Sequence, residues 1–394
     1  MRFSVCVAAV LAWFPSNEAR SQSPEQLATW LKRFPEADAN KDGTLSLEEA
    51  YAYRQKLLGT TKAGKGGAPR EFSVDPRWES KAFPENAVSL LSPEKIKEVN
   101  DGKVTAFPAP SNGVLRLVGT GHSFMAPGYK TLPLICRAAG FDQPMLTHTG
   151  GGITGSARYK WEEENGIFQF DGKPKPILLS SIANADWEAM IWGPYFNDRP
   201  AYYECWIDFC LKYHPEMKFY LSDAWPQVEQ LGNIPKTEEP LTAETIARLG
   251  REKHGLYAGL IDSLNAKYGN RVYVLPTCDA MVLAAERFHR GELEGVEGIN
   301  TAIGGKTRSL WRDQLGHLGP GFEYLEGYVF YATLYGKSPE LIESDIAPTV
   351  SQPNGFPGRK LDRVFRQIAW EAVTNNPLSG IRDADGDGKA DPGA

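Results

Sequence analysis

The segment VLRLVGTGHSF, residues 114–124, decides the fold that we expect for this chain. Its first half alternates apolar residues as a β-strand does, and its second half holds two glycines followed by His122 and Ser123. Gly119 and Gly121 permit a tight turn that would lift Ser123 out of a sheet, with a helix starting shortly afterwards. The segment therefore predicts a strand, a turn and a helix that together present a serine hydroxyl.

Similar apolar runs recur along the following 230 or so residues and alternate with amphipathic segments. The expected strands are 114–118, 144–148, 176–182, 188–192, 218–223 and 272–277. The expected helices between them include 129–140, 199–214 and 241–269. This alternation predicts an α/β fold with a doubly wound, flavodoxin-like parallel sheet, whose active site would lie at the carboxyl ends of the strands.

The composition fits a large globular domain with appendages. The chain has 394 residues, 42% of them hydrophobic, and a net charge of -6. This charge gives no general attraction to nucleic acid or to an anionic membrane surface, so we expect neither as a partner.

The first 22 residues have the anatomy of a secretory signal peptide. One arginine precedes an apolar run from Phe3 to Phe14, and a polar stretch with small residues follows. That run is too short to span a bilayer comfortably, and an uncleaved anchor is the alternative interpretation. We expect an exported protein, periplasmic or extracellular, without membrane insertion.

Composition divides the rest of the chain into four segments. We expect an EF-hand segment at 24–58, a linker and irregular extension at 59–112, the main domain at 113–345 and a C-terminal helix with an acidic tail at 346–394. Four cysteines remain after removal of the signal, and they allow three disulfide pairings or buried free thiols: Cys136, Cys205, Cys210 and Cys278.

The stretch DANKDGTLSLEE, residues 38–49, has the EF-hand pattern for calcium. Oxygen-bearing residues fill positions 1, 3, 5, 7, 9 and 12, and Gly43 at position 6 permits the sharp turn. The expected Ca²⁺ ligands are Asp38, Asn40, Asp42, Thr44, Ser46 and Glu49. The acidic tail repeats half of this pattern with Asp383, Asp385, Asp387 and Asp391, so it is either a second calcium site or a solvated acidic terminus. We expect calcium to be structural and to take no part in catalysis.

Asp313 and His317 lie in one loop before a Gly-Pro turn and a long helix. Nucleophilic serine chemistry needs a neutral imidazole to accept the hydroxyl proton and a carboxylate to orient that imidazole. Ser123, His317 and Asp313 are therefore the candidate catalytic residues.

At these residues the sequence resembles the SGNH (GDSL-like) hydrolase superfamily over roughly 113–345, in a secreted bacterial subgroup. Gly121, His122 and Ser123 match its serine block, and THTGGGITG, residues 147–155, matches its glycine block. The acid and base stand as D-x-x-x-H, one residue longer than the family's D-x-x-H, and GPYFND spaces Gly193 and Asn197 two residues too widely for the family's asparagine block.

The resemblance implies an esterase or deacetylase that forms an acyl-enzyme on Ser123, with Gly151, Gly152 and Asn197 as oxyanion donors and without a catalytic cofactor. The substrate would be a small-molecule or glycan ester, and aromatic residues between 187 and 225 would then either stack on sugar rings or simply pack in the core. The alternative is an inactive scaffold of the same type that serves as a calcium-stabilised binding or surface-attachment module.

Overall fold

The computed structural model describes residues 35–46, 104–110, 113–149, 178–193, 200–346 and 355–392, together with Tyr159 and isolated residues between 27 and 97. The chain divides into two compact units, Met1–Ser80 and Lys81–Ala394. The expected signal peptide, residues 1–22, lies outside the described residues, as does most of the expected linker.

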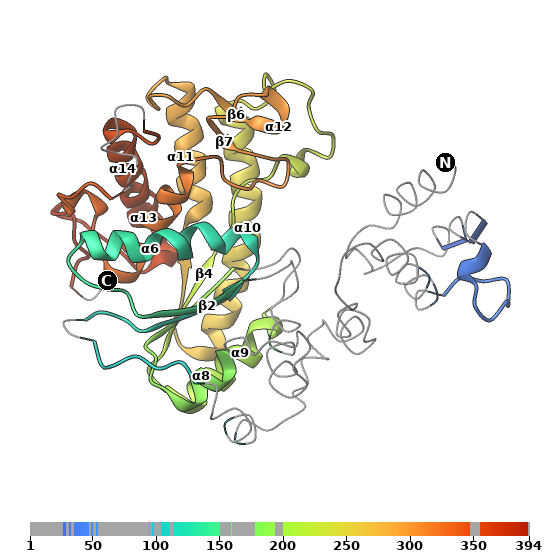
Figure 1. Ribbon diagram of the computed structural model, residues 1–394, viewed down its shortest axis with the longest axis horizontal. Helices are drawn as coiled ribbons and strands as arrows, with labels where there is room; N and C mark the ends of the chain where they lie inside the picture. The colour runs from blue at the N-terminus through green and yellow to red at the C-terminus, as the bar shows by residue number, and fades with distance from the viewer. Residues whose placement is uncertain are drawn as a thin grey trace. The chain divides into compact units, whose positions relative to one another are not determined.

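A five-stranded parallel sheet forms the centre of the larger unit (Figure 1). The strands lie in the order β2 (Met145–Thr149), β1 (Leu117–Gly121), β3 (Ala189–Trp192), β4 (Lys218–Ser222) and β5 (Val272–Leu275). The expected parallel α/β fold is confirmed. The strand order 2-1-3-4-5 is that of flavodoxin-like sheets, in which β1 and β3 flank the point where the winding direction reverses.

Helices cover the sheet on both sides. In Figure 1, α6 (Ala126–Ala138) lies above the sheet, whereas α8 (Leu178–Asn184) and α9 (Ala201–Tyr213) lie below it. Helix α6 packs against α13 (Phe322–Tyr335), which in turn packs against α14 (Arg359–Asn375). The close approach of α6 and α13 depends on Gly128 and Gly327, because a Cβ atom at Gly128 would lie 2.5 Å from the ring of Phe330.

Two further helices connect the last strands. Helix α10 (Ala243–Tyr268) leads into β5, and α11 (Thr277–His289) follows it and contacts both α10 and α14. A separate two-stranded parallel sheet contains β6 (Gly298–Asn300) and β7 (Ser309–Trp311), with the short helix α12 (Thr301–Gly304) between them. The described residues also contain five 3-10 turns: η1 (Pro35–Ala37), η5 (Ser123–Met125), η6 (Val228–Leu231), η7 (Pro339–Leu341) and η8 (Pro377–Ser379).

Two local predictions need correction. The apolar run 176–182 was expected to be a strand, but Leu178–Asn184 form helix α8, in which Leu178 and Ile182 are completely buried. A short continuous apolar run does not distinguish a buried helix from a buried strand. Strand β1 begins later than expected and includes both glycines. A side chain at position 119 would clash with the Tyr129 ring, so the strand needs glycine there.

The aromatic residues described between 187 and 225 belong to the core. Six of the tryptophans and tyrosines among them are no more than 3% exposed: Trp187, Trp192, Tyr202, Tyr203, Trp206 and Trp225. Trp192 stacks on Phe219 with ring centroids 5.2 Å apart. Core packing, and not an exposed sugar-stacking wall, therefore accounts for these six residues.

Cys136, Cys205, Cys210 and Cys278 are all free thiols in this structure. Burial raises the pKa of each of them, so these cysteines act as small apolar residues. None of the described helices combines the length and the apolar character needed to cross a membrane.

Candidate active site

Ser123 stands at the carboxyl end of β1, where the chain leaves the sheet and enters η5 and α6. Gly121, with φ of 134°, ends the strand in a conformation that favours glycine, and its neighbour His122 caps η5 by accepting the Phe124 N–H at Nδ1. The turn leaves Ser123 exposed, while the next two residues, Phe124 and Met125, are buried. A solvent-accessible hydroxyl is thus held on a rigid turn.

His317 connects Ser123 to Asp313 through its two ring nitrogens. Its Nε2 lies 2.8 Å from Ser123 Oγ, and its Nδ1 lies 2.8 Å from Asp313 Oδ2. An ionised carboxylate only accepts hydrogen bonds, so a neutral His317 carries its proton on Nδ1 and leaves Nε2 free to accept the serine proton. The three residues predicted from the sequence are brought together in the arrangement that activates a serine.

The loop that carries Asp313 and His317 accommodates the longer D-x-x-x-H spacing. The His317 backbone N–H donates to Asp313 Oδ1 at 3.1 Å, while the ring engages Oδ2 of the same carboxylate. The Arg312 N–H donates to the His317 carbonyl at 2.8 Å, and Trp311 pairs with Leu318 across the loop. Both carboxylate oxygens of Asp313 are therefore held against one residue, which fixes the orientation of the carboxylate despite the extra residue.

Two residues that the sequence analysis did not identify hold this loop. The buried Asn300 donates from Nδ2 to the Asp313 carbonyl at 2.8 Å, and Gln227 donates from Nε2 to the Leu315 carbonyl at 2.7 Å. Glu238 in turn accepts the backbone N–H groups of Ile299 and Asn300. No sequence pattern signals these contacts, since Gln227 lies 88 positions from the residue that it holds.

Replacement of Asn300 by aspartate tests this support. The variant keeps the oxygen that caps α12 at the Ala302 N–H but replaces the donor to the Asp313 carbonyl with a second acceptor. The Asp313 carbonyl would keep the Gly316 N–H as a donor at 3.3 Å but would face a buried carboxylate instead of the amide. We therefore expect the free energy of unfolding to fall by about 1–3 kcal/mol. Urea denaturation measures the change, and stability equal to wild type would contradict the assigned contact.

An aromatic contact closes one side of the site. Phe124 stacks on Trp225 with ring centroids 4.5 Å apart and meets the His317 imidazole edge-on at 4.9 Å. Both rings are buried, and Phe124 shields one side of the imidazole from water. The expected oxyanion donors Gly151, Gly152 and Asn197 lie outside the described residues.

A hollow in the described part of the chain lies away from the carboxyl end of β1. It has a volume of about 390 Å³ and is lined by residues such as Asp262, Val272 and Leu378, at the start of β5. Ser123, in contrast, follows the carboxyl end of its strand. In parallel α/β sheets the chemistry lies at the carboxyl ends, so we assign the hollow no role in catalysis.

The first acidic loop is suited to calcium. Asp38 accepts the N–H groups of Asp42 and Gly43, and Glu49 reaches back to accept those of Ala39 and Asn40. Gly43 has φ of 80° at the sharp turn. Hydrogen bonds, above all from the Thr44 and Ser46 side chains, lower the pKa of Asp42 and Glu49 respectively, so both groups stay ionised. Hard, ionised oxygen donors around a tight loop are what calcium prefers.

The tail also brings carboxylates together. One oxygen each from Asp383, Asp385 and Asp391 lies within 4.8 Å of the others. Asp387 instead accepts the Lys389 N–H and forms an ion pair with its ammonium group at 3.3 Å. The loop is tied to the rest of the unit by the Trp370 N–H, which donates to Asp383 at 2.9 Å.

Comparisons with known proteins give only distant matches. No protein family matches the sequence, and no curated protein resembles it significantly. Among solved structures, a DUF4886 family protein from Bacteroides uniformis ATCC 8492 aligns over 66% of this chain and 95% of its own, with 11% identity and a TM-score of 0.39. A candidate platelet activating factor from Streptococcus pneumonia aligns over 62% of this chain and 91% of its own, with 12% identity and a TM-score of 0.32. Similarities as distant as these do not indicate an activity for this chain.

Proposed function

We propose that this protein is an exported, calcium-binding serine hydrolase of the SGNH type that removes an acyl group from a carbohydrate or a similar polar ester. The observation that carries the proposal is the continuous hydrogen-bonded arrangement of Ser123, His317 and Asp313 at an exposed turn. The position of the serine directly after β1 in a 2-1-3-4-5 sheet, with the acid and base in one late loop, supports the SGNH type.

The proposed reaction follows from the hydrogen bonds of His317 to Ser123 and Asp313. Ser123 Oγ attacks the ester carbonyl as its proton passes to His317 Nε2, and the Asp313 carboxylate stabilises the imidazolium that forms. The imidazolium then protonates the departing alcohol, which leaves an acyl group on Ser123. Water loses a proton to Nε2 as it attacks this acyl-enzyme, and the acid product leaves with the serine hydroxyl restored.

The tetrahedral intermediates carry a negative charge on the former carbonyl oxygen, and hydrogen-bond donors must be positioned to stabilise this oxyanion. The backbone amides at Ser123 and in the glycine segment at Gly151 and Gly152, with the side chain of Asn197, are the proposed donors. Loss of one such donor typically lowers kcat by about 10²- to 10³-fold.

A fluorophosphonate probe tests the proposal, because it phosphonylates only an activated serine. We expect the purified, calcium-loaded mature protein to gain one adduct that peptide mapping places on Ser123. Ser123→Ala should abolish labelling, and His317→Ala should slow it sharply. Ser263→Ala is the matched control, since this exposed serine of α10 donates to the Gly259 carbonyl of its own helix. Absence of labelling in folded wild type would favour the alternative of a binding module.

The two acidic loops are the proposed calcium sites. We expect calorimetry on the wild-type protein to detect two calcium-binding events, and Glu49→Gln to remove the one at the first loop, because that carboxylate can bind through both oxygens. Asp385→Asn should weaken only the tail site. Unchanged calcium binding in Glu49→Gln would contradict the EF-hand assignment.

A further inference from the structure

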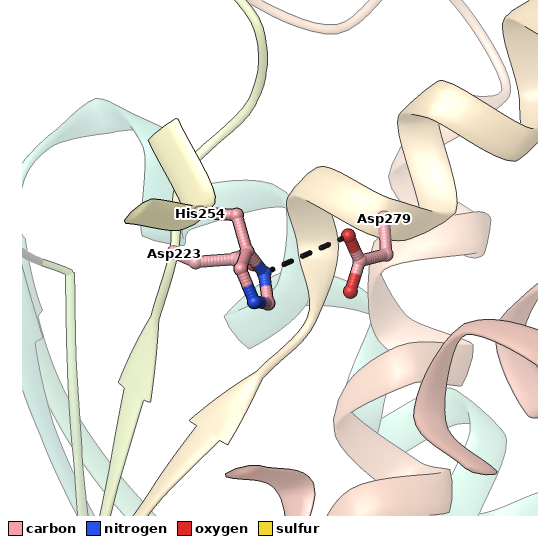
Figure 2. A group of neighbouring side chains, drawn as sticks. All are labelled: Asp223, His254 and Asp279. Carbon is pink, nitrogen blue, oxygen red and sulfur yellow. Dashed lines mark ion pairs between the residues drawn. The ribbon is translucent and has the colours of Figure 1, made fainter. Parts of the chain in front are cut away.

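A second group of ionisable side chains lies where β4, α10 and α11 meet. Figure 2 shows Asp223 projecting from the end of β4 toward His254 of α10 and Asp279 of α11. A carboxylate oxygen of each aspartate and an imidazole nitrogen of His254 all lie within 4.8 Å of one another. The proposed hydrolysis uses none of these three residues.

Asp223 contributes a carboxylate oxygen that lacks a partner. Its side chain is buried, with only 1% of the residue exposed. Oδ1 accepts the Cys278 N–H at 2.8 Å and the Thr277 hydroxyl at 3.2 Å, whereas Oδ2 is buried and has no hydrogen-bond donor among the described residues. A buried carboxylate oxygen without a donor is costly, and natural proteins usually compensate such groups with a proton, a water molecule or a cation.

The other two residues leave ligand atoms facing this oxygen. Asp279 uses Oδ2 to accept the Asn376 amide at 2.7 Å, and its Oδ1 lies 4.0 Å from His254 Nδ1 (Figure 2). The side chains of His254 and Asp279 are 39% and 34% exposed, so an ion could reach the group from solvent. The Asn376 amide thus orients the Asp279 carboxylate without contacting the ion itself, as hydrogen-bond partners of metal ligands do.

The local charge favours a cation. Two carboxyl groups, those of Asp223 and Asp279, lie close together beside one imidazole. Lys253 is a nearby buried cation, but its ammonium donates to Gln227 Oε1 at 2.8 Å. One lysine therefore does not neutralise two carboxylates that would otherwise be negative together.

We propose that Asp223, His254 and Asp279 form a binding site for a divalent transition-metal ion of the Zn²⁺ class. One imidazole nitrogen and two carboxylate oxygens suit zinc better than calcium, which takes oxygen ligands only. Ligand atoms at a tetrahedral zinc lie about 3.4 Å apart. The three ligand atoms here lie within 4.8 Å of one another, so small side-chain rotations would bring them to that distance. The ion would tie the end of β4 to α10 and α11, and its binding does not depend on hydrolytic activity.

Zinc calorimetry on the mature chain tests the proposal. Millimolar calcium in the buffer saturates the proposed calcium loops, and a His317→Ala background removes the imidazole of the serine site as a competing ligand. We expect one zinc site in this background. His254→Gln and Asp279→Asn should each weaken it at least tenfold, because loss of a mere outer-sphere partner already costs about 10- to 100-fold.

Matched variants distinguish a built site from unspecific binding. Asp262→Asn removes an exposed carboxylate from the same helix as His254 and should leave zinc affinity unchanged. His254 is partly exposed, so its variant should fold even if the buried Asp223→Asn does not. Zinc should also raise the Tm of the parent but not that of His254→Gln. Equal zinc binding by His254→Gln and Asp262→Asn, or none by the parent, would overturn the proposal.

Discussion

Replacing Ser123 by alanine is expected to lower kcat for ester hydrolysis by about 10⁵- to 10⁶-fold, and replacing His317 by alanine should cost nearly as much. The reason is geometric, because Ser123 Oγ and His317 Nε2 share one hydrogen bond of 2.8 Å and act as a unit. Without the imidazole the hydroxyl keeps its proton, and without the hydroxyl the imidazole has no nucleophile to activate.

The double variant sharpens this expectation. If the two residues act as a unit, the double variant Ser123→Ala/His317→Ala should be no slower than either single variant. Its residual activity would come from substrate binding and oxyanion stabilisation. Steady-state rates on an activated acetyl ester and on acetylated sugars measure the effect, with Ser263→Ala as control. Losses that multiply in the double variant would mean that the residues act independently, contrary to the proposed mechanism.

The site could be predicted in part because its three members lie in strong local patterns. The alternation before Gly119 and the glycines around Thr120 indicated a strand and a turn, and the parallel sheet that places this turn at its carboxyl edge is confirmed. The C-terminal helix expected within 346–394 is present as α14, since its apolar residues recur with a helical period and end before a proline at position 377.

The remaining features depend on tertiary contacts. The sequence of Leu178–Asn184 alone does not distinguish a helix from a strand, because the segment is buried on all sides and its apolar run shows no period. Asn300 and Gln227 hold the acid-base loop from other parts of the chain, so their roles emerge only when the fold brings them to the Asp313 and Leu315 carbonyls. The Asp223, His254 and Asp279 group has the same origin, because it joins residues from three separate elements.

Asp313→Asn is expected to produce the second largest loss, about 10⁴-fold in kcat, by reversing the tautomer of His317. The His317 backbone N–H donates to the Asp313 oxygen at 3.1 Å, and this donor should keep the amide oxygen of an asparagine in the same place. The amide nitrogen would then face Nδ1, where the carboxylate oxygen Oδ2 now lies at 2.8 Å. Since an amide NH₂ only donates, it would force the imidazole proton onto Nε2, which could no longer accept the proton of Ser123.

Proton NMR separates this explanation from a general loss of structure. The wild-type protein should show a low-field resonance from the His317 Nδ1–H, and Asp313→Asn should lose it while keeping the Tm and circular dichroism of a folded protein. Asp313→Glu, which retains an acceptor, should recover part of the activity. A loss smaller than about tenfold in Asp313→Asn would instead indicate that the carboxylate does not set the tautomer, so that the orientation of His317 would have to come from the Arg312 contact to its backbone and from its packing on Phe124.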